Sequence, residues 1–125
     1  MIKDKTQKIA VIGLGFVGLP LTMLLVSKGY KVIGIDIDKK KIESIRNSKS
    51  YISDISDDNL KDANHSNRFM VTTNNDEIKN VDTVIICVPT PLNSDKSPNL
   101  NYVVSAAESI QKRLQKGQLI VLESS

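Results

Sequence analysis

The residues best suited to chemistry form the run Gly13-Leu14-Gly15-Phe16-Val17-Gly18, which follows an apolar stretch and opens a helical pattern. In this spacing Gly13 permits a tight turn, Gly15 lets the backbone approach a phosphate without a β-carbon in the way, and Gly18 lets a helix pack closely on a strand. Free N–H groups at the start of that helix, together with its dipole, would bind phosphate oxygens. The run predicts a dinucleotide site; glycines that serve only the turn and the packing of the helix are the alternative.

A carboxylate stands where a second contact to a dinucleotide is expected. Asp36 ends the next apolar run, and there it would accept hydrogen bonds from the adenosine ribose hydroxyls. Its charge would repel a 2′-phosphate, which favours NAD over NADP; a plain strand-end or capping carboxylate is the alternative. We interpret Asp38 as the cap of the following helix. Lys41 either reaches the adenosine side or is a solvated helix lysine.

A third candidate segment is Cys87-Val88-Pro89-Thr90-Pro91, at the end of a long apolar run. In a doubly wound sheet such ends line the ligand crevice, so Thr90 is placed to contact a cofactor, unless it is only a loop residue between prolines. Cys87 has no histidine or cationic partner nearby in sequence, and we interpret it as a small buried hydrophobe. His65 is interpreted as a surface residue. The sequence therefore predicts neither a catalytic base nor a metal site.

Strands must alternate with helices to position these groups. Apolar runs predict strands at 8–13, 31–36, 69–72 and 81–88 and a buried strand at 118–122. Helical spacing predicts helices from Val17 to Gly29, from 38 to 47 and from Val103 to Gly117, with a short surface helix near 57–63. The pattern indicates an α/β fold, a doubly wound and mostly parallel Rossmann sheet, truncated after the fifth strand.

Composition excludes several other classes of protein. The chain has 125 residues, 40% of them apolar, with 17 Lys and Arg against 14 Asp and Glu, for a net charge of +3. Scattered lysines and few aromatic residues argue against nucleic-acid binding, and no run is long enough to predict a membrane span. The single cysteine fits a reducing cytoplasm. Because domains seldom end beside a core strand, we expect a fragment.

Five motifs in order resemble the N-terminal domain of UDP-sugar dehydrogenases, in the UDP-glucose/GDP-mannose dehydrogenase family. They are GLGFVGLP at 13–20, GIDID at 34–38, VPTPL at 88–92, PNLNYV at 98–103 and LESS at 122–125. VPTPL, followed by the Pro-x-Leu-x-Tyr-Val stretch, resembles the branch acting on UDP-N-acetylhexosamines, such as UDP-N-acetylmannosamine or UDP-N-acetylglucosamine, more than the UDP-glucose branch.

The resemblance implies oxidation of the sugar C6 hydroxyl to a carboxylate with two NAD+, through a cysteine-bound intermediate, for capsule or surface polysaccharide synthesis. The family's cysteine and lysine belong to later domains, so residues 1–125 would be an NAD-binding domain without the central helical and C-terminal UDP-sugar domains, inactive alone. The full-length protein would be a homodimer. The predicted cofactor-binding residues are Gly13, Leu14, Gly15, Phe16, Val17, Gly18, Asp36, Lys41, Pro89 and Thr90.

In two parts of the chain the resemblance does not define what the residues do. The segment Glu123-Ser124-Ser125 matches the start of a stretch lining the nicotinamide end in the family, but the role of Ser125 is undefined. The family's Gly- and Pro-containing stretch after the second helix is replaced by 53–59, which leaves any contact from that loop undefined. A stand-alone NAD-sensing module and another hydroxy-acid-type NAD dehydrogenase remain the alternative functions.

Overall fold

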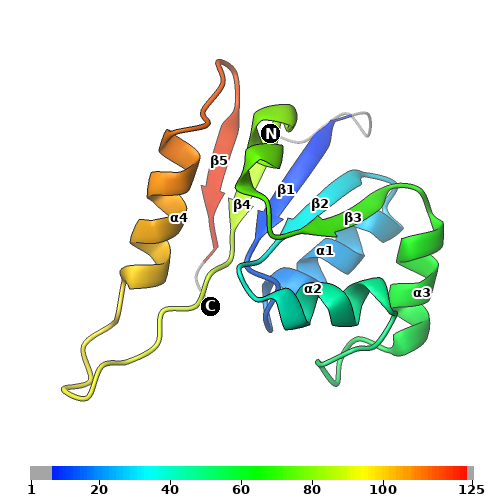
Figure 1. Cartoon of the computed structure of the whole chain (residues 1–125), viewed down its shortest axis with the longest axis horizontal. Helices are drawn as coiled ribbons and strands as arrows, with labels where there is room; N and C mark the ends of the chain where they lie inside the picture. Colours follow the sequence, from blue (N-terminus) through cyan, green and yellow to red (C-terminus); the bar gives the residue numbers. More distant parts are fainter. Residues whose placement is uncertain (1–6, 124–125) are drawn as a thin grey trace.

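Five parallel strands form one sheet in the computed structural model, which describes residues 7–123 (Figure 1). The strand order is β3-β2-β1-β4-β5, and every neighbouring pair is parallel. The α/β doubly wound sheet expected from the sequence is therefore confirmed. In chain order the elements are β1 (Lys8–Ile12), α1 (Gly18–Ser27), β2 (Lys31–Ile35), α2 (Lys39–Arg46), α3 (Asp57–His65), β3 (Phe69–Thr72), η1 (Asn75–Asn80), β4 (Thr83–Ile86), α4 (Asn101–Gln111) and β5 (Leu119–Leu122).

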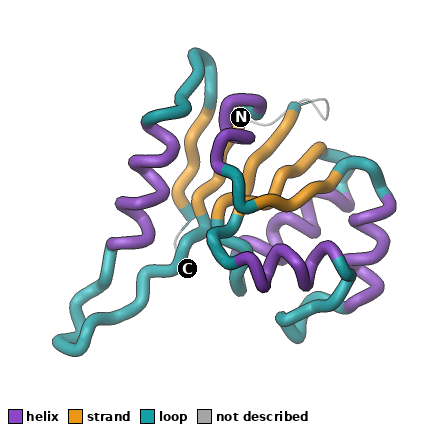
Figure 2. The backbone as a smooth tube through the Cα atoms, in the orientation of Figure 1, coloured by secondary structure: helices purple, strands orange, loops and turns teal. Residues whose placement is uncertain are grey.

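Side chains of β1 alternate between two separate apolar clusters, one on each face of the sheet. Ile9 and Val11 pack with α1, α2 and α3, whereas Ala10 and Ile12 pack with η1 and α4. Because successive residues of a strand point to opposite faces, a central strand covered on both sides must be apolar throughout. Figure 2 shows the strands as one twisted layer with helices to either side.

The chain reverses its direction of winding at β1. β1 pairs with β2 on one side and with β4 on the other, so that Ile12 lies level with Ile35 and Ile86 at the carboxyl ends of the three strands. At such a switch point the connections leave in opposite directions and open a crevice between them. The segments that follow Ile12, Ile35 and Ile86 therefore converge on one place.

Two helices begin with side-chain caps, of which the sequence analysis expected the first. The Asp38 side chain accepts a hydrogen bond from the backbone N–H of Lys40 at the start of α2, as expected. α3 begins with a capping box, in which Ser56 and Asn59 exchange side-chain and backbone hydrogen bonds. The short helix expected near 57–63 is confirmed and extends to His65.

Several expected elements have different bounds, and β4 and the final helix differ most. β4 covers Thr83–Ile86 instead of 81–88, because Val81 closes η1, a 3-10 helix that the sequence patterns did not indicate. The final helix runs from Asn101 to Gln111 and buries Ala106 and Ile110, whereas Leu114 lies beyond its end and is exposed.

The strand expected at 118–122 is present, but the expectation that it is buried is wrong. A strand forms at Leu119–Leu122, but Leu119, Ile120 and Leu122 are exposed and Val121 is half-buried. An edge strand has a hydrogen-bonded neighbour on only one side, and the described helices leave much of the surface of β5 uncovered. No helix among residues 7–123 is long and apolar enough to cross a membrane.

Candidate cofactor site

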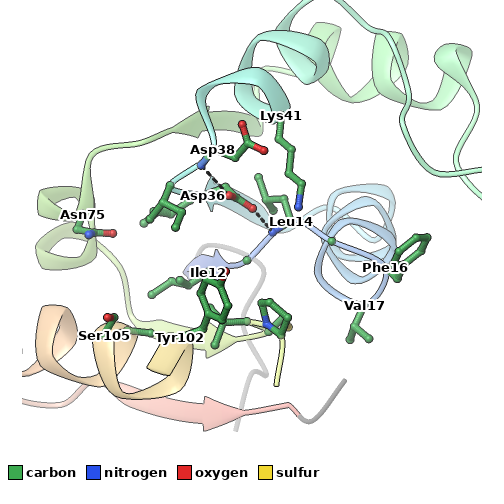
Figure 3. Close-up of a pocket in the computed structure, with 18 of the residues that line it drawn as sticks. Ile12, Leu14, Phe16, Val17, Asp36, Asp38, Lys41, Asn75, Tyr102 and Ser105 are labelled. Carbon is green, nitrogen blue, oxygen red and sulfur yellow. Dashed lines mark hydrogen bonds between the residues drawn. The ribbon is translucent and has the colours of Figure 1, made fainter. Parts of the chain in front are cut away.

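A cavity of about 640 Å³ lies at the carboxyl ends of β1, β2 and β4. Its walls come from the turn before α1, the loop before α2, the segment between α2 and α3, the start of η1, the end of β4 and one side of α4 (Figure 3). The lining residues are Ile12, Gly13, Leu14, Gly15, Phe16, Val17, Ile35, Asp36, Ile37, Asp38, Lys41, Tyr51, Ile52, Asn75, Cys87, Val88, Pro89, Tyr102, Ser105, Ala106 and Ser109.

The three glycines of the first turn differ in the space around them. Gly13 has φ +94°, and a β-carbon there would lie 2.8 Å from the carbonyl carbon and oxygen of Cys87. A β-carbon on Gly18 would lie 1.7 Å from the carbonyl oxygen of Gly13. A β-carbon on Gly15 would meet nothing within 4 Å. The turn is therefore closed by Gly13 and Gly18, and the backbone at Gly15 borders open space on the cavity.

The N-terminus of α1 differs from those of α2 and α3. Its N-cap is Val17, which makes no side-chain capping hydrogen bond, and its first turn carries no acidic residue. The first N–H groups of a helix have no intrahelical partner and hold partial positive charge. In α1 the Leu19 N–H donates to the Gly15 carbonyl oxygen at 3.1 Å and Pro20 has no N–H, so an anion such as a pyrophosphate would bind at the N–H groups before Leu19.

Asp36 directly follows β2 and is 9% exposed. One of its carboxylate oxygens accepts a hydrogen bond from the Leu14 N–H at 2.8 Å, and the other accepts from the Asp38 N–H at 2.9 Å (Figure 3). Each carboxylate oxygen can accept about two hydrogen bonds. Asp36 therefore orders the turns after β1 and β2 and retains acceptor capacity for a ligand hydroxyl.

Lys41 and Tyr51 lie beside Asp36. Lys41, on α2, is half-buried, and its ammonium group lies 5.8 Å from the centroid of the Tyr51 ring. In Figure 3 the Lys41 side chain extends from α2 toward the turn that contains Leu14. Lys41 therefore lines the cavity, and its contact with the adenosine side stays a prediction.

The end of β4 forms another wall, through Cys87, Val88 and Pro89. Thr90 is half-buried in the following loop and is not part of the cavity lining. Cys87 is 4% exposed, which confirms its interpretation as a buried residue. Burial, and to a smaller extent the charge of Glu123, raises the pKa of the Cys87 thiol to about 11. At neutral pH this thiol is protonated and is a poor nucleophile.

The other residues that the sequence analysis considered differ in their position relative to the cavity. Phe16 is 84% exposed and points away from Asp36 in Figure 3, although its residue borders the cavity. Gly18 is buried at the start of α1 and shapes the turn without lining the cavity. His65 is exposed at the end of α3, as interpreted. Glu123 is exposed, and Ser124 and Ser125 lie outside the described residues.

Sequence patterns missed the residues that later elements bring to the cavity. Tyr51 and Ile52 come from the polar segment after α2, Asn75 from η1, and Tyr102, Ser105 and Ser109 from α4. Asn75 and Ser109 contact each other, with an amide nitrogen to hydroxyl distance of 3.5 Å. An available signal was the isolated aromatic residue at position 51, followed by Ile52 and Ile55 in an otherwise polar stretch.

The arrangement fits a dinucleotide. The open backbone at Gly15 leaves room for a pyrophosphate at the uncapped helix end, and Asp36 offers acceptors beside it. Residues 7–125 match the family model described as "UDP-glucose/GDP-mannose dehydrogenase family, NAD binding domain".

Named relatives and solved structures agree with this match. The chain is 40% identical to the UDP-N-acetyl-D-mannosamine dehydrogenase of Methanococcus vannielii over 98% of its own length and 29% of that protein's. It is 36% identical to the UDP-N-acetyl-D-glucosamine 6-dehydrogenase of Salmonella typhi, over 94% and 27% of the two lengths. The solved UDP-D-ManNAc dehydrogenase of Pyrococcus horikoshii superposes with a TM-score of 0.86 at 35% identity, over 94% of this chain and 28% of that one.

Proposed function

Because the chain belongs to the UDP-glucose/GDP-mannose dehydrogenase family and matches its NAD binding domain, we propose that it is the cofactor-binding part of a UDP-sugar 6-dehydrogenase. It spans less than a third of the length of the relatives described above. Their names support a UDP-N-acetylhexosamine as the substrate of the whole protein, and one of them specifies the 6-position. Following the resemblance stated above, we propose that C6 is oxidised to the carboxylate with two NAD+. The proposal assigns residues 1–125 to NAD and the sugar chemistry to other domains.

The observation that carries the proposal is the convergence of Asp36 and the glycine turn on one cavity. Bound NAD+ would supply the hydride acceptor for the oxidation. Backbone N–H groups at the start of α1 bind the pyrophosphate, and the open space at Gly15 admits it. The free lone pairs of Asp36 accept from the adenosine ribose hydroxyls, and its charge disfavours a 2′-phosphate.

The other predicted binding residues have supporting roles in this proposal. Lys41 approaches the adenosine end, where its charge offsets those of Asp36 and Asp38. Pro89 and Thr90 lie along the loop after β4, Pro89 as part of the wall and Thr90 as a hydroxyl or backbone contact once the cofactor is bound. Leu14, Phe16 and Val17 contribute the backbone of the turn.

This chain alone is proposed to bind NAD without oxidising a sugar. Cys87 is its only cysteine, and the thiol is buried and protonated at neutral pH. We propose the cytoplasm as its compartment, because a free buried thiol suits a reducing environment. For the whole protein we propose a homodimer that acts in surface or capsular polysaccharide synthesis.

Calorimetry with NADH, NAD+ and NADP+ tests the cofactor assignment. We expect NADH and NAD+ to bind and NADP+ to bind more weakly. Asp36→Asn replaces one acceptor oxygen with an NH2 group, which then faces the N–H of Leu14 or of Asp38. It should weaken NADH binding by at least about tenfold, through the loss of at least one charge-assisted hydrogen bond. Asp62→Asn, an exposed change on α3, is the matched control and should leave affinity unchanged.

Two results would contradict the proposal. Tighter binding of NADP+ than of NAD+, or equal NADH affinity in Asp36→Asn and the unsubstituted chain, would remove Asp36 from the ribose site. NADH production by this chain with a UDP-N-acetylhexosamine would show that Cys87 or another group here is catalytic.

A further inference from the structure

The segment between α2 and α3 is anchored so that it delivers one aromatic side chain to the cavity. Ile52 and Ile55 are 5% and 9% exposed and belong to the core cluster on the α1 face. The Ser50 hydroxyl donates to the Ile52 carbonyl at 2.8 Å, and the Ser50 N–H donates to Asp57 at 2.7 Å. The position of Tyr51, between these anchors, is therefore fixed by packing and by local hydrogen bonds.

The Tyr51 hydroxyl reaches the glycine turn. It donates a hydrogen bond to the carbonyl oxygen of Leu14 at 2.5 Å, across 37 positions of sequence. The N–H of Leu14 donates to Asp36 at 2.8 Å. Two successive peptide groups of the turn, one on each side of Leu14, are thus each held by a side chain from another part of the chain.

The Leu14 side chain allows the turn little freedom to shift. It is fully buried, and its methyl groups lie against the backbone at Gly34, where a β-carbon would come 3.0 and 3.1 Å from them. With the side chain packed and both peptide groups bonded, the turn has one well-defined shape. Such preorganisation lowers the entropic cost of binding a ligand to its N–H groups.

The ring of Tyr51 makes a second contact, with a cation. The Lys41 ammonium group lies 5.8 Å from the ring centroid, within the range of a cation–π interaction. Lys41 and Tyr51 both line the cavity, beside Asp36 and Asp38. One side chain therefore contacts the turn through its hydroxyl and the lysine through its ring.

We propose that Tyr51 is a positioning residue of the dinucleotide site. Its hydroxyl holds the Gly13–Gly15 turn in the shape that receives the pyrophosphate, and its ring holds the Lys41 ammonium group at the adenosine end. This inference rests on the proposed function and assigns a role to the segment after α2. Burial, with the charges of Asp36 and Asp38, raises the pKa of Tyr51, so the hydroxyl keeps its proton and donates at all physiological pH values.

Tyr51→Phe removes the hydroxyl and keeps the ring. Loss of one neutral hydrogen bond in the turn should weaken NADH binding about fivefold. Tyr30→Phe is the matched control, because Tyr30 packs on the core before β2, away from the cavity, and should leave affinity unchanged. Amide hydrogen exchange at Leu14 should accelerate in Tyr51→Phe while exchange in β2 stays the same, a local effect that a general loss of stability does not produce.

A double-mutant cycle tests the ring. Lys41→Met should weaken NADH binding more in the unsubstituted chain than in Tyr51→Leu, because the lysine is oriented only where the ring is present. Additive effects of the two substitutions would overturn this half of the proposal.

The outcomes separate this inference from the function on which it rests. If the unsubstituted chain does not bind NADH, both the proposed function and the role of Tyr51 are overturned. If it binds and Tyr51→Phe binds within about twofold, the cofactor site stands and the positioning role of Tyr51 is overturned. A lower melting temperature in Tyr51→Phe, with unchanged NADH affinity and unchanged exchange at Leu14, would mean that the hydroxyl serves stability alone.

Discussion

The centre of the sheet and its β5 edge differ in how far the chain covers its own strands. β1 and β2 each bury four of their five residues. At the β5 edge, no residue of β5 is fully buried, and α4 leaves Tyr102 and Val104 43% and 51% exposed. The turn and the carboxylate proposed to bind the dinucleotide both follow the buried strands.

Polar contacts between surface elements support the β5 side. Arg113 and Asp76 form an ion pair at 2.8 Å that joins the end of α4 to η1. The Gln118 amide donates to the carbonyl oxygens of Ile78 and Val81, both at 2.7 Å, and fixes the start of β5. Exposed ion pairs contribute little stability, and buried apolar area contributes much more. Substitutions should therefore have large effects beside β1 and small ones on β5.

The largest expected effect is that of Gly18→Ala. The added β-carbon would lie 1.7 Å from the Gly13 carbonyl oxygen, and neither backbone can move without separating α1 from β1. We expect a loss of at least about 4 kcal/mol in the free energy of unfolding, measured in urea, together with loss of NADH binding.

Gly15→Ala is the control for this substitution, because its β-carbon meets nothing within 4 Å. It should unfold within about 0.5 kcal/mol of the unsubstituted chain yet bind NADH more weakly, since the methyl group occupies the approach to the turn. Equal stability of Gly18→Ala and Gly15→Ala would contradict the packing described for the turn.

Local patterns were sufficient to predict the part of the site that depends on neighbouring residues. The glycine spacing and the position of Asp36 follow from one strand–helix–strand unit, whose strand and helix periods are both present in the sequence. The cap at Asp38 is equally local. The geometry of this part of the site depends mainly on residues that are close together in sequence.

Contacts between distant segments were not predictable in the same way. The hydrogen bond from Tyr51 to Leu14 depends on how the segment after α2 packs on the sheet, which no periodic pattern encodes. The exposure of β5 was also missed, because an apolar run of four to eight residues has the same sequence appearance in a central strand and in an uncovered edge strand.

The next largest difference in the free energy of unfolding is expected between the same substitution made in two strands of the sheet. Ile9 in β1 is fully buried, whereas Ile120 in β5 is 38% exposed. Ile9→Ala should cost about 3 kcal/mol in the free energy of unfolding, through lost burial and the cavity left behind. Ile120→Ala should cost about 1 kcal/mol or less, because solvent fills the space. Chemical denaturation of both variants measures the difference, and equal costs would mean that β5 is covered in solution.

An effect smaller than that of Ile9→Ala is expected at Cys87, which follows β4, as a dependence of stability on alkaline pH. The pKa of its thiol rises from an ordinary value of 9.0 to about 11 in the folded chain. Above pH 9 the unfolded chain loses this proton first, so the stabilisation present below pH 9 is lost between pH 9 and 11. At about 1.4 kcal/mol per pKa unit, the loss approaches about 3 kcal/mol at most, and we expect about 2 kcal/mol.

Comparison with Cys87→Ala isolates this contribution, because lysines and tyrosines titrate in both proteins. The difference in unfolding free energy between the two should be constant up to pH 9 and then shrink. Glu123→Gln tests the weaker cause of the shift: since burial outweighs the charge of Glu123, this variant should retain most of the alkaline loss. If Glu123→Gln abolished the loss, the charge beside β5 would control the thiol, and the tight packing of Cys87 against Gly13 and Gly18 would not be what keeps it protonated.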